Sequence, residues 1–145
     1  MSEELFIEDN ELDSVKIFSL FKSAFFDTEL SEDGDIIIDG WPVANLSVDK
    51  ERFMIRFFIW FETKKSSDEL LLRFINKANF EKIMVRFTID NTMSDRSAAC
   101  ADYYLSFKGG LTAYQIVDSY RKFHSIAKDI FSNQEFRDFI ADKKI

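Results

Sequence analysis

The sequence predicts an α+β fold, an antiparallel sheet with helices packed on one face. Two patterns of apolar residues lead to this expectation. In three long segments apolar residues recur at three- and four-residue steps, as on the buried side of an α-helix, and in others they alternate with polar residues, as in half-buried strands. The order of the segments, αβββ(β)αββα(α), groups the strands into runs, which is typical of α+β proteins.

The first helix is expected from about Ser14 to Phe26. Asp13 precedes it, and its carboxylate is suited to accept a hydrogen bond from a free N–H group of the first turn. The apolar stripe comprises Val15, Phe18, Phe21 and Phe25. A short acidic arm, residues 1–12, comes before it, and we expect the arm to be mobile unless its apolar residues dock. These residues are Leu5, Phe6 and Ile7.

Four strands should follow the first helix. Thr28–Leu30 and Asp35–Ile38 flank Asp33-Gly34, a hairpin signal, because glycine readily adopts the positive φ of a tight turn. After a break at Trp41-Pro42 come a third strand and then the longest one. Their expected ranges are 44–48 and 52–63.

The second helix should begin at Ser66, where Glu69 would complete a capping box, and end near Asn79. Its buried side comprises Leu70, Leu71, Phe74, Ile75 and Ala78. Two alternating segments, residues 83–90 and 99–107, are then expected to form antiparallel strands.

The third and last helices also carry capping signals. Thr112 and Gln115 predict a capping box at the start of the third helix, and Ser132 and Glu135 predict another at the start of the last. The apolar positions of the third helix are Ala113, Ile116, Val117, Tyr120, Phe123, Ala127 and Ile130. Phe136, Phe139 and Ile140 follow in the last helix.

Composition favours one globular domain over residues 13–145. The net charge of −7 disfavours nucleic acid as a partner, because a polyanion would be repelled and only short basic pairs are present. The single cysteine, Cys100, indicates a reducing compartment. The acidic start lacks the basic region of a secretory signal, and the longest apolar run, Phe57–Phe61, is too short to span a bilayer. We therefore expect a cytoplasmic protein without a membrane partner.

Three strings of residues carry a family resemblance. They are residues 33–38 (Asp-Gly-Asp-Ile-Ile-Ile), residues 72–80 from helix to strand, and residues 104–111 (Tyr-Leu-Ser-Phe-Lys-Gly-Gly-Leu). Together with the element order they resemble the bacterial YbjN-like family, labelled "putative sensory transduction regulators", over roughly residues 13–131. The resemblance implies the topology of the small dimeric type III secretion chaperones and a non-enzymatic interaction role. It supplies no catalytic residues.

Candidate chemistry is sparse. Cys100 and His124 are the only thiol and imidazole, and together they could form a nucleophile, but His124 flanks an apolar helix face and a small buried thiol is the simpler interpretation. One His and one Cys cannot build a usual zinc site, and the aspartates near residue 35 lack calcium-loop spacing. We expect no catalytic residue, no metal and no cofactor.

The loop at Lys108-Gly109-Gly110 leads into a helix N-terminus, where backbone amides can hold an anion. It lacks the spacing of a phosphate-binding P-loop. A simple strand-to-helix connection is therefore the favoured interpretation.

The fourth strand is apolar on both faces. One face carries Phe53, Ile55, Phe57, Ile59 and Phe61, and the other carries Met54, Arg56, Phe58 and Trp60. If the odd-numbered residues lie under the helices, the outward set also includes Met84, Arg86 and Tyr104 from neighbouring strands. Arg, Trp, Tyr, Phe and Met are enriched at protein interfaces. Alternatively, the assignment is reversed, or the arm or the last helix covers this face.

The hypothesis is a non-enzymatic regulatory or chaperone-like protein that binds an unidentified protein through its sheet face and forms a homodimer. The binding residues would be Arg56, Phe58, Trp60, Arg86 and Tyr104. One alternative is a toxin-neutralising immunity protein, because the small size and the acidity of the chain are suitable for that role. Another is a small-ligand-binding domain or enzyme with a pocket between helix and sheet, beside Cys100 and His124.

Overall fold

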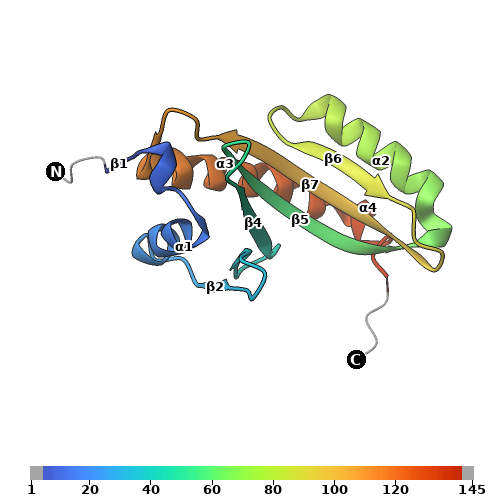
Figure 1. Ribbon diagram of the computed structural model, residues 1–145. Helices are drawn as coiled ribbons and strands as arrows, with labels where there is room; N and C mark the ends of the chain where they lie inside the picture. The colour runs from blue at the N-terminus through green and yellow to red at the C-terminus, as the bar shows by residue number, and fades with distance from the viewer. Residues whose placement is uncertain (1–4, 142–145) are drawn as a thin grey trace.

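A six-stranded antiparallel sheet with helices on one side forms the body of the protein (Figure 1). The structure is a computed structural model that describes residues 5–141. The strand order is β2 (Thr28–Leu30), β3 (Ile36–Ile38), β4 (Ala44–Asp49), β5 (Met54–Lys64), β7 (Arg96–Ser106) and β6 (Arg86–Asp90). The predicted α+β class and the run of strands are thereby confirmed.

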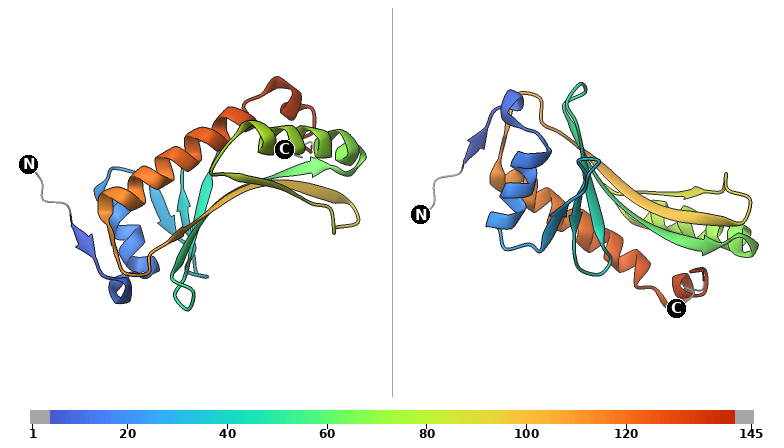
Figure 2. Two further views of the ribbon diagram at one scale, coloured as in Figure 1. Left: turned by 90° about the horizontal axis from the view of Figure 1, so that it is seen from above. Right: turned by 60° about the horizontal axis from the view of Figure 1, so that its bottom comes forward.

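The helices lie on one side of this sheet. They are α1 (Ser14–Ser23), α2 (Asp68–Glu81), α3 (Ala113–Phe131) and the short α4 (Gln134–Arg137). Two 3-10 turns, η1 (Asp9–Glu11) and η2 (Lys65–Ser67), precede α1 and α2. Figure 2 shows α2 and α3 on the same side of the sheet, whereas no described helix covers the opposite side of β5, β6 and β7.

Pairing of β5 with β7 determines which side chains enter the core. The two strands are in register over eleven residue pairs, from Met54 opposite Ser106 to Lys64 opposite Arg96. Side chains alternate between faces along a strand, and Ile55, Phe57 and Ile59 are fully buried beneath the helices. The odd-numbered face of the longest strand is therefore the core face.

Aromatic rings join the helices to this core face. Tyr120 of α3 makes edge-to-face contacts with Phe21 of α1 and with Phe57 of β5, at centroid distances of 5.3 and 5.9 Å. Near the other end of α3, Phe131 lies 4.9 Å from both Phe61 and Phe136. Such contacts stabilise beyond simple burial, and they account for much of the high phenylalanine content.

The predicted start of α1 is confirmed, but its buried stripe is different. Asp13 accepts a hydrogen bond from the Lys16 amide at 2.8 Å, as a capping residue does. The helix ends at Ser23, before the expected Phe26, and Phe25 is 97% exposed with φ of 67°. The helix buries Ile17 and Phe21, whereas Val15 is exposed. Because the chain leaves the helical path before Phe25, that residue cannot continue the stripe.

The boundaries of α2 and β6 also differ from the prediction. The helix begins at Asp68, and no Ser66–Glu69 capping box forms, because residues 65–67 form a 3-10 turn. The helix runs past Asn79, whose side-chain amide bonds both the N–H and the C=O of Phe87 at 2.8 Å. Leu70, placed in the buried set, is exposed.

The strand predicted to begin at residue 83 begins at Arg86. Met84 has φ of 74°, a conformation that cannot extend a strand, and Ile83 is exposed. In the third helix the predicted Thr112–Gln115 capping box is present. The last helix uses Asn133 as its cap, in place of Ser132.

The described residues before α1 pack against the core and form a second, two-stranded sheet with the segment that precedes α3. Residues 1–4 of the predicted arm lie outside the described residues. β1 (Phe6–Ile7) pairs antiparallel with β8 (Leu111–Thr112), and Ile7 is buried. The Gly109 amide donates to the Asp9 carboxylate at 2.9 Å. The Gly109 amide therefore binds a carboxylate of its own chain. This agrees with the prediction that residues 108–110 are a simple connection from strand to helix.

We predict that Gly110→Ala destabilises the protein by about 2 kcal/mol or more. Gly110 has φ of 91°, and a Cβ atom there would lie 2.7 Å from the Ile7 carbonyl oxygen and against the Phe6 ring. Gly109→Ala is the control, because Gly109 has φ of 86° but open space around its Cα. Urea denaturation would measure both variants, and an equal loss at the two positions would contradict the steric argument.

Candidate protein-binding face

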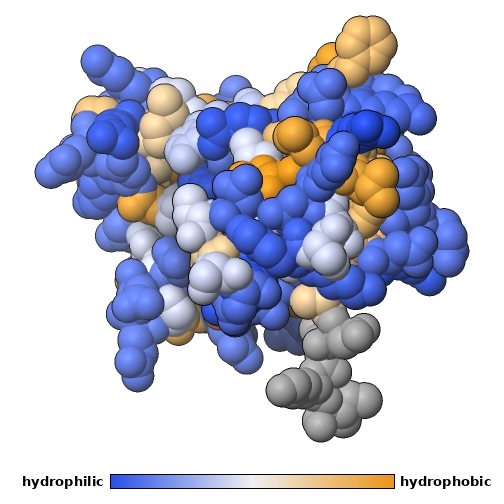
Figure 3. All heavy atoms as spheres, turned by 90° about the vertical axis from the view of Figure 1, so that its right-hand side faces the viewer, coloured by the Kyte–Doolittle hydropathy of each residue, from blue (hydrophilic) through white to orange (hydrophobic). Residues whose placement is uncertain are grey.

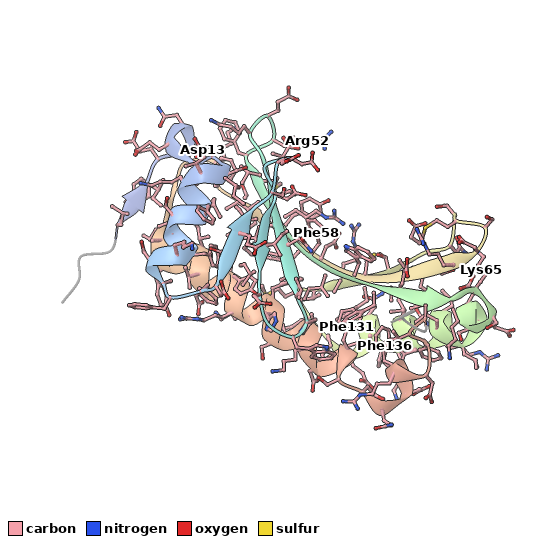
Figure 4. The ribbon with its side chains drawn as sticks, turned by 90° about the horizontal axis from the view of Figure 1, so that it is seen from below. Asp13, Arg52, Phe58, Lys65, Phe131 and Phe136 are labelled. Atoms are coloured by element: carbon pink, nitrogen blue, oxygen red, sulfur yellow. The ribbon has the colours of Figure 1, made fainter. Side chains whose placement is uncertain are left out.

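The five predicted binding residues lie on one face of the sheet, opposite the helices. In the register, Arg56 lies opposite Tyr104, and Asp102 lies opposite Phe58 on one side and Arg86 on the other. Trp60 continues the same side of β5. In Figure 4 the labelled Phe58 lies on the other side of the sheet from Phe131 and Phe136. We call the surface formed by Arg56, Phe58, Trp60, Arg86, Asp102 and Tyr104 the open face.

A buried carboxylate organises the centre of the open face. Asp102 is 2% exposed and accepts hydrogen bonds from two arginines. Arg86 forms a fork, with Nε at 2.9 Å from one oxygen and Nη2 at 2.7 Å from the other. Arg56 approaches the second oxygen with Nε at 3.3 Å and Nη2 at 3.1 Å. Charge-assisted bonds of this kind are stronger than neutral ones.

Two aromatic rings also contact one of these arginines, Arg56. The Arg56 guanidinium lies 4.5 Å from the centroid of the Phe58 ring and 5.8 Å from that of Tyr104. Hydrogen bonding and the negative charge of Asp102 raise the pKa of Arg86 above its usual value. Asp102 therefore holds both guanidinium groups in defined orientations, and the two rings add to this for Arg56.

Asp102 was absent from the predicted site, although it connects two of its members. Its signal in the sequence is an acidic residue in the middle of a strand pattern, between Ala101 and Tyr103. The sequence does not show that Arg56 and Arg86 lie on either side of Asp102, because this depends on the register of the three strands. Met84, assigned to the outward set, lies before β6 and outside the open face.

An apolar cleft adjoins the Trp60 end of the open face. Its volume is about 380 Å³, and it forms where β4 begins at Ala44 and leaves the last part of β5 without that neighbour. Trp60 is 54% exposed and Trp41 is 46% exposed. The remaining lining residues are Pro42, Val43, Phe61, Glu62, Ile140 and Ala141.

Neither the residues before α1 nor α4 covers the open face in the described part of the chain. β1 pairs with β8, and Phe136 of α4 packs against Phe61 and Phe74 on the helix side.

Figure 3, which views the right-hand end of Figure 1, shows hydrophobic surface gathered among hydrophilic side chains. In residues 5–141, no helix combines the length and the apolar content needed to cross a membrane.

The two candidate nucleophile residues lie on opposite sides of the sheet. Cys100 pairs with Trp60 on the open-face side, whereas His124 lies on α3 and its Nε2 atom is 2.9 Å from the Pro42 carbonyl oxygen. Desolvation raises the pKa of the Cys100 thiol, which disfavours the reactive thiolate. The structure thus contradicts a Cys100–His124 pair.

Clefts between helix and sheet do not bring the two residues together either. One cleft, of about 590 Å³, lies between α2 and β6 and is lined by neither Cys100 nor His124. A smaller cleft of about 330 Å³ includes His124 and Tyr120 but not Cys100. Within the described residues, no group of three or more His, Cys, Asp or Glu side chains could hold a metal ion.

We predict that Asp102→Asn destabilises the fold by about 1–3 kcal/mol, because it leaves two half-exposed arginines without their shared carboxylate. Urea denaturation measures the change. Glu62→Gln is the matched control, since Glu62 pairs with Arg96 at 3.0 Å near the surface and its loss should cost less than about 1 kcal/mol. Equal effects of the two variants would show that Asp102 does not organise the face.

Comparison with known proteins finds a matching family and similar solved structures. Residues 16–135 match the family described as "YbjN: Putative bacterial sensory transduction regulator". The crystal structure of YbjN from E. coli, titled "a putative transcription regulator", superposes with a TM-score of 0.77 over 88% of this chain and 95% of that chain. The two are 11% identical, so this likeness shows the fold alone. No protein with curated annotation matches the chain.

Proposed function

Because this chain belongs to the YbjN family of regulators, we propose that it is a cytoplasmic regulatory or chaperone-like protein that acts by binding another protein through its open face. The observation that carries the proposal is the group of exposed aromatic and arginine side chains on the uncovered side of the sheet. Regulation through protein binding requires a surface of this kind and no catalytic group.

The composition of the open face supports this role. Trp, Tyr and Arg are the residues that most often dominate binding energy at interfaces. Trp60 and Tyr104 are exposed, and the cleft beside Trp60 could receive an apolar side chain of the partner. Because Asp102, Phe58 and Tyr104 already hold Arg56, binding would immobilise few additional side chains and lose little entropy.

The proposal includes a homodimer, whose second copy is one candidate occupant of the open face. An antiparallel sheet commonly leaves one face to solvent, but the two exposed aromatic residues on this face, Trp60 and Tyr104, favour association. Self-association and binding of another protein are separable by experiment.

We predict that light scattering gives the mass of two chains for the wild type and of one folded chain for Trp60→Arg. The new charge would enter an apolar contact without a partner. Tyr114→Arg is the matched control, because Tyr114 is an exposed aromatic residue on α3, away from the open face.

If both the wild type and Trp60→Arg are dimers, the self-association surface lies elsewhere on the chain. A monomeric wild type would remove the dimer from the proposal. Partner binding would then be tested by pull-down from native lysate, in which loss with Trp60→Arg and retention with Tyr114→Arg is the expected result.

A further inference from the structure

We infer that the open face recognises a carboxylate side chain of its partner at Arg56 and Arg86. The inference rests on the proposed function, since it specifies the chemistry of the partner. The occupant is an Asp or Glu residue within an apolar or aromatic segment of a different protein.

The charges of the open face support an acidic occupant. Two guanidinium groups share the single carboxylate of Asp102, so the cluster has one positive charge in excess. The positions that directly adjoin the cluster in the register carry no acidic group; they are Ser47, Phe58, Thr88, Cys100 and Tyr104. Three acidic residues lie further along the same face: Asp49 and Glu62, which pair with Arg52 and Arg96, and Asp90 at the end of β6. This local excess is an exception in a chain whose net charge is −7.

The hydrogen-bonding groups support the same occupant. Arg56 and Arg86 both direct Nε and Nη2 to Asp102, and among residues 5–141 neither Nη1 group has a hydrogen-bond partner. The Arg86 side chain is 61% exposed and that of Arg56 is 35% exposed, so a ligand can reach them. A carboxylate is a strong acceptor for guanidinium N–H groups, and here the donors are already oriented.

The surroundings favour a peptide carboxylate over a nucleic acid. One excess charge matches one carboxylate, and the rings of Phe58 and Tyr104 beside it match apolar groups of a peptide. Nucleic-acid affinity depends on many phosphate contacts, which this single excess charge cannot supply.

The test uses a random-peptide display library selected on the immobilised full-length chain. The expected result is enrichment of peptides with Asp or Glu beside an aromatic or aliphatic residue. A fluorescent synthetic copy of an enriched peptide should bind about tenfold more weakly to Arg86→Gln, as measured by anisotropy. The same loss is expected when the peptide's own Asp or Glu is changed to Asn or Gln.

Arg96→Gln is the matched control. Arg96 begins β7 and pairs with Glu62, so its loss removes the same charge without touching the cluster. Affinity should then stay within about twofold of wild type. Arg86→Lys keeps the charge without the guanidinium fork and should restore part of the affinity. Circular dichroism establishes that each variant is folded.

The outcomes separate this inference from the proposed function. Enriched peptides that lack acidic residues, and that lose binding with Trp60→Arg but not with Arg86→Gln, would overturn the carboxylate and keep the binding face. If neither Trp60→Arg nor Arg86→Gln weakens the binding of any enriched peptide, both the carboxylate site and the binding face are overturned. A labelled single-stranded DNA 12-mer that binds more tightly than the peptide would also overturn the inference. The inference would also be overturned if Trp60→Arg breaks a wild-type dimer and no acidic peptide dissociates that dimer, because a second copy would then occupy the open face.

Discussion

The long antiparallel pair of β5 and β7 is the constraint on which the rest of the structure depends. Eleven residue pairs in one register decide that Ile55, Phe57 and Ile59 lie beneath the helices. A shift of one residue would exchange the two faces of the strand and expose these side chains. Burial of these three side chains beneath the helices therefore favours the observed register strongly.

Packing on the core face accounts for most of the seventeen phenylalanines of this 145-residue chain. Rings from separate elements meet at two places, around Tyr120 and around Phe131. The first joins α1 and α3 to the sheet, and the second joins α3 and α4 to β5. Large flat side chains can bridge these elements with few residues, so the four-residue α4 suffices.

The opposite side of the same strands has a polar centre with aromatic residues around it. Asp102 is buried only because Arg56 and Arg86 cover it and neutralise its charge. The geometry that removes this carboxylate from water also leaves the arginines with a net positive charge. Stability of the sheet and the proposed recognition of a partner thus depend on one cluster.

The sequence by itself determined the α+β class, the order of the elements and the membership of the two strand faces, because periods of two and 3.6 residues are local properties. It also placed Arg56, Phe58, Trp60, Arg86 and Tyr104 together correctly, although their role as binding residues stays a prediction. Only the tertiary structure decided the role of Asp102, the docking of Ile7 and the separation of Cys100 from His124. These depend on register and on contacts between residues far apart in the chain, and such contacts leave no periodic signal in the sequence.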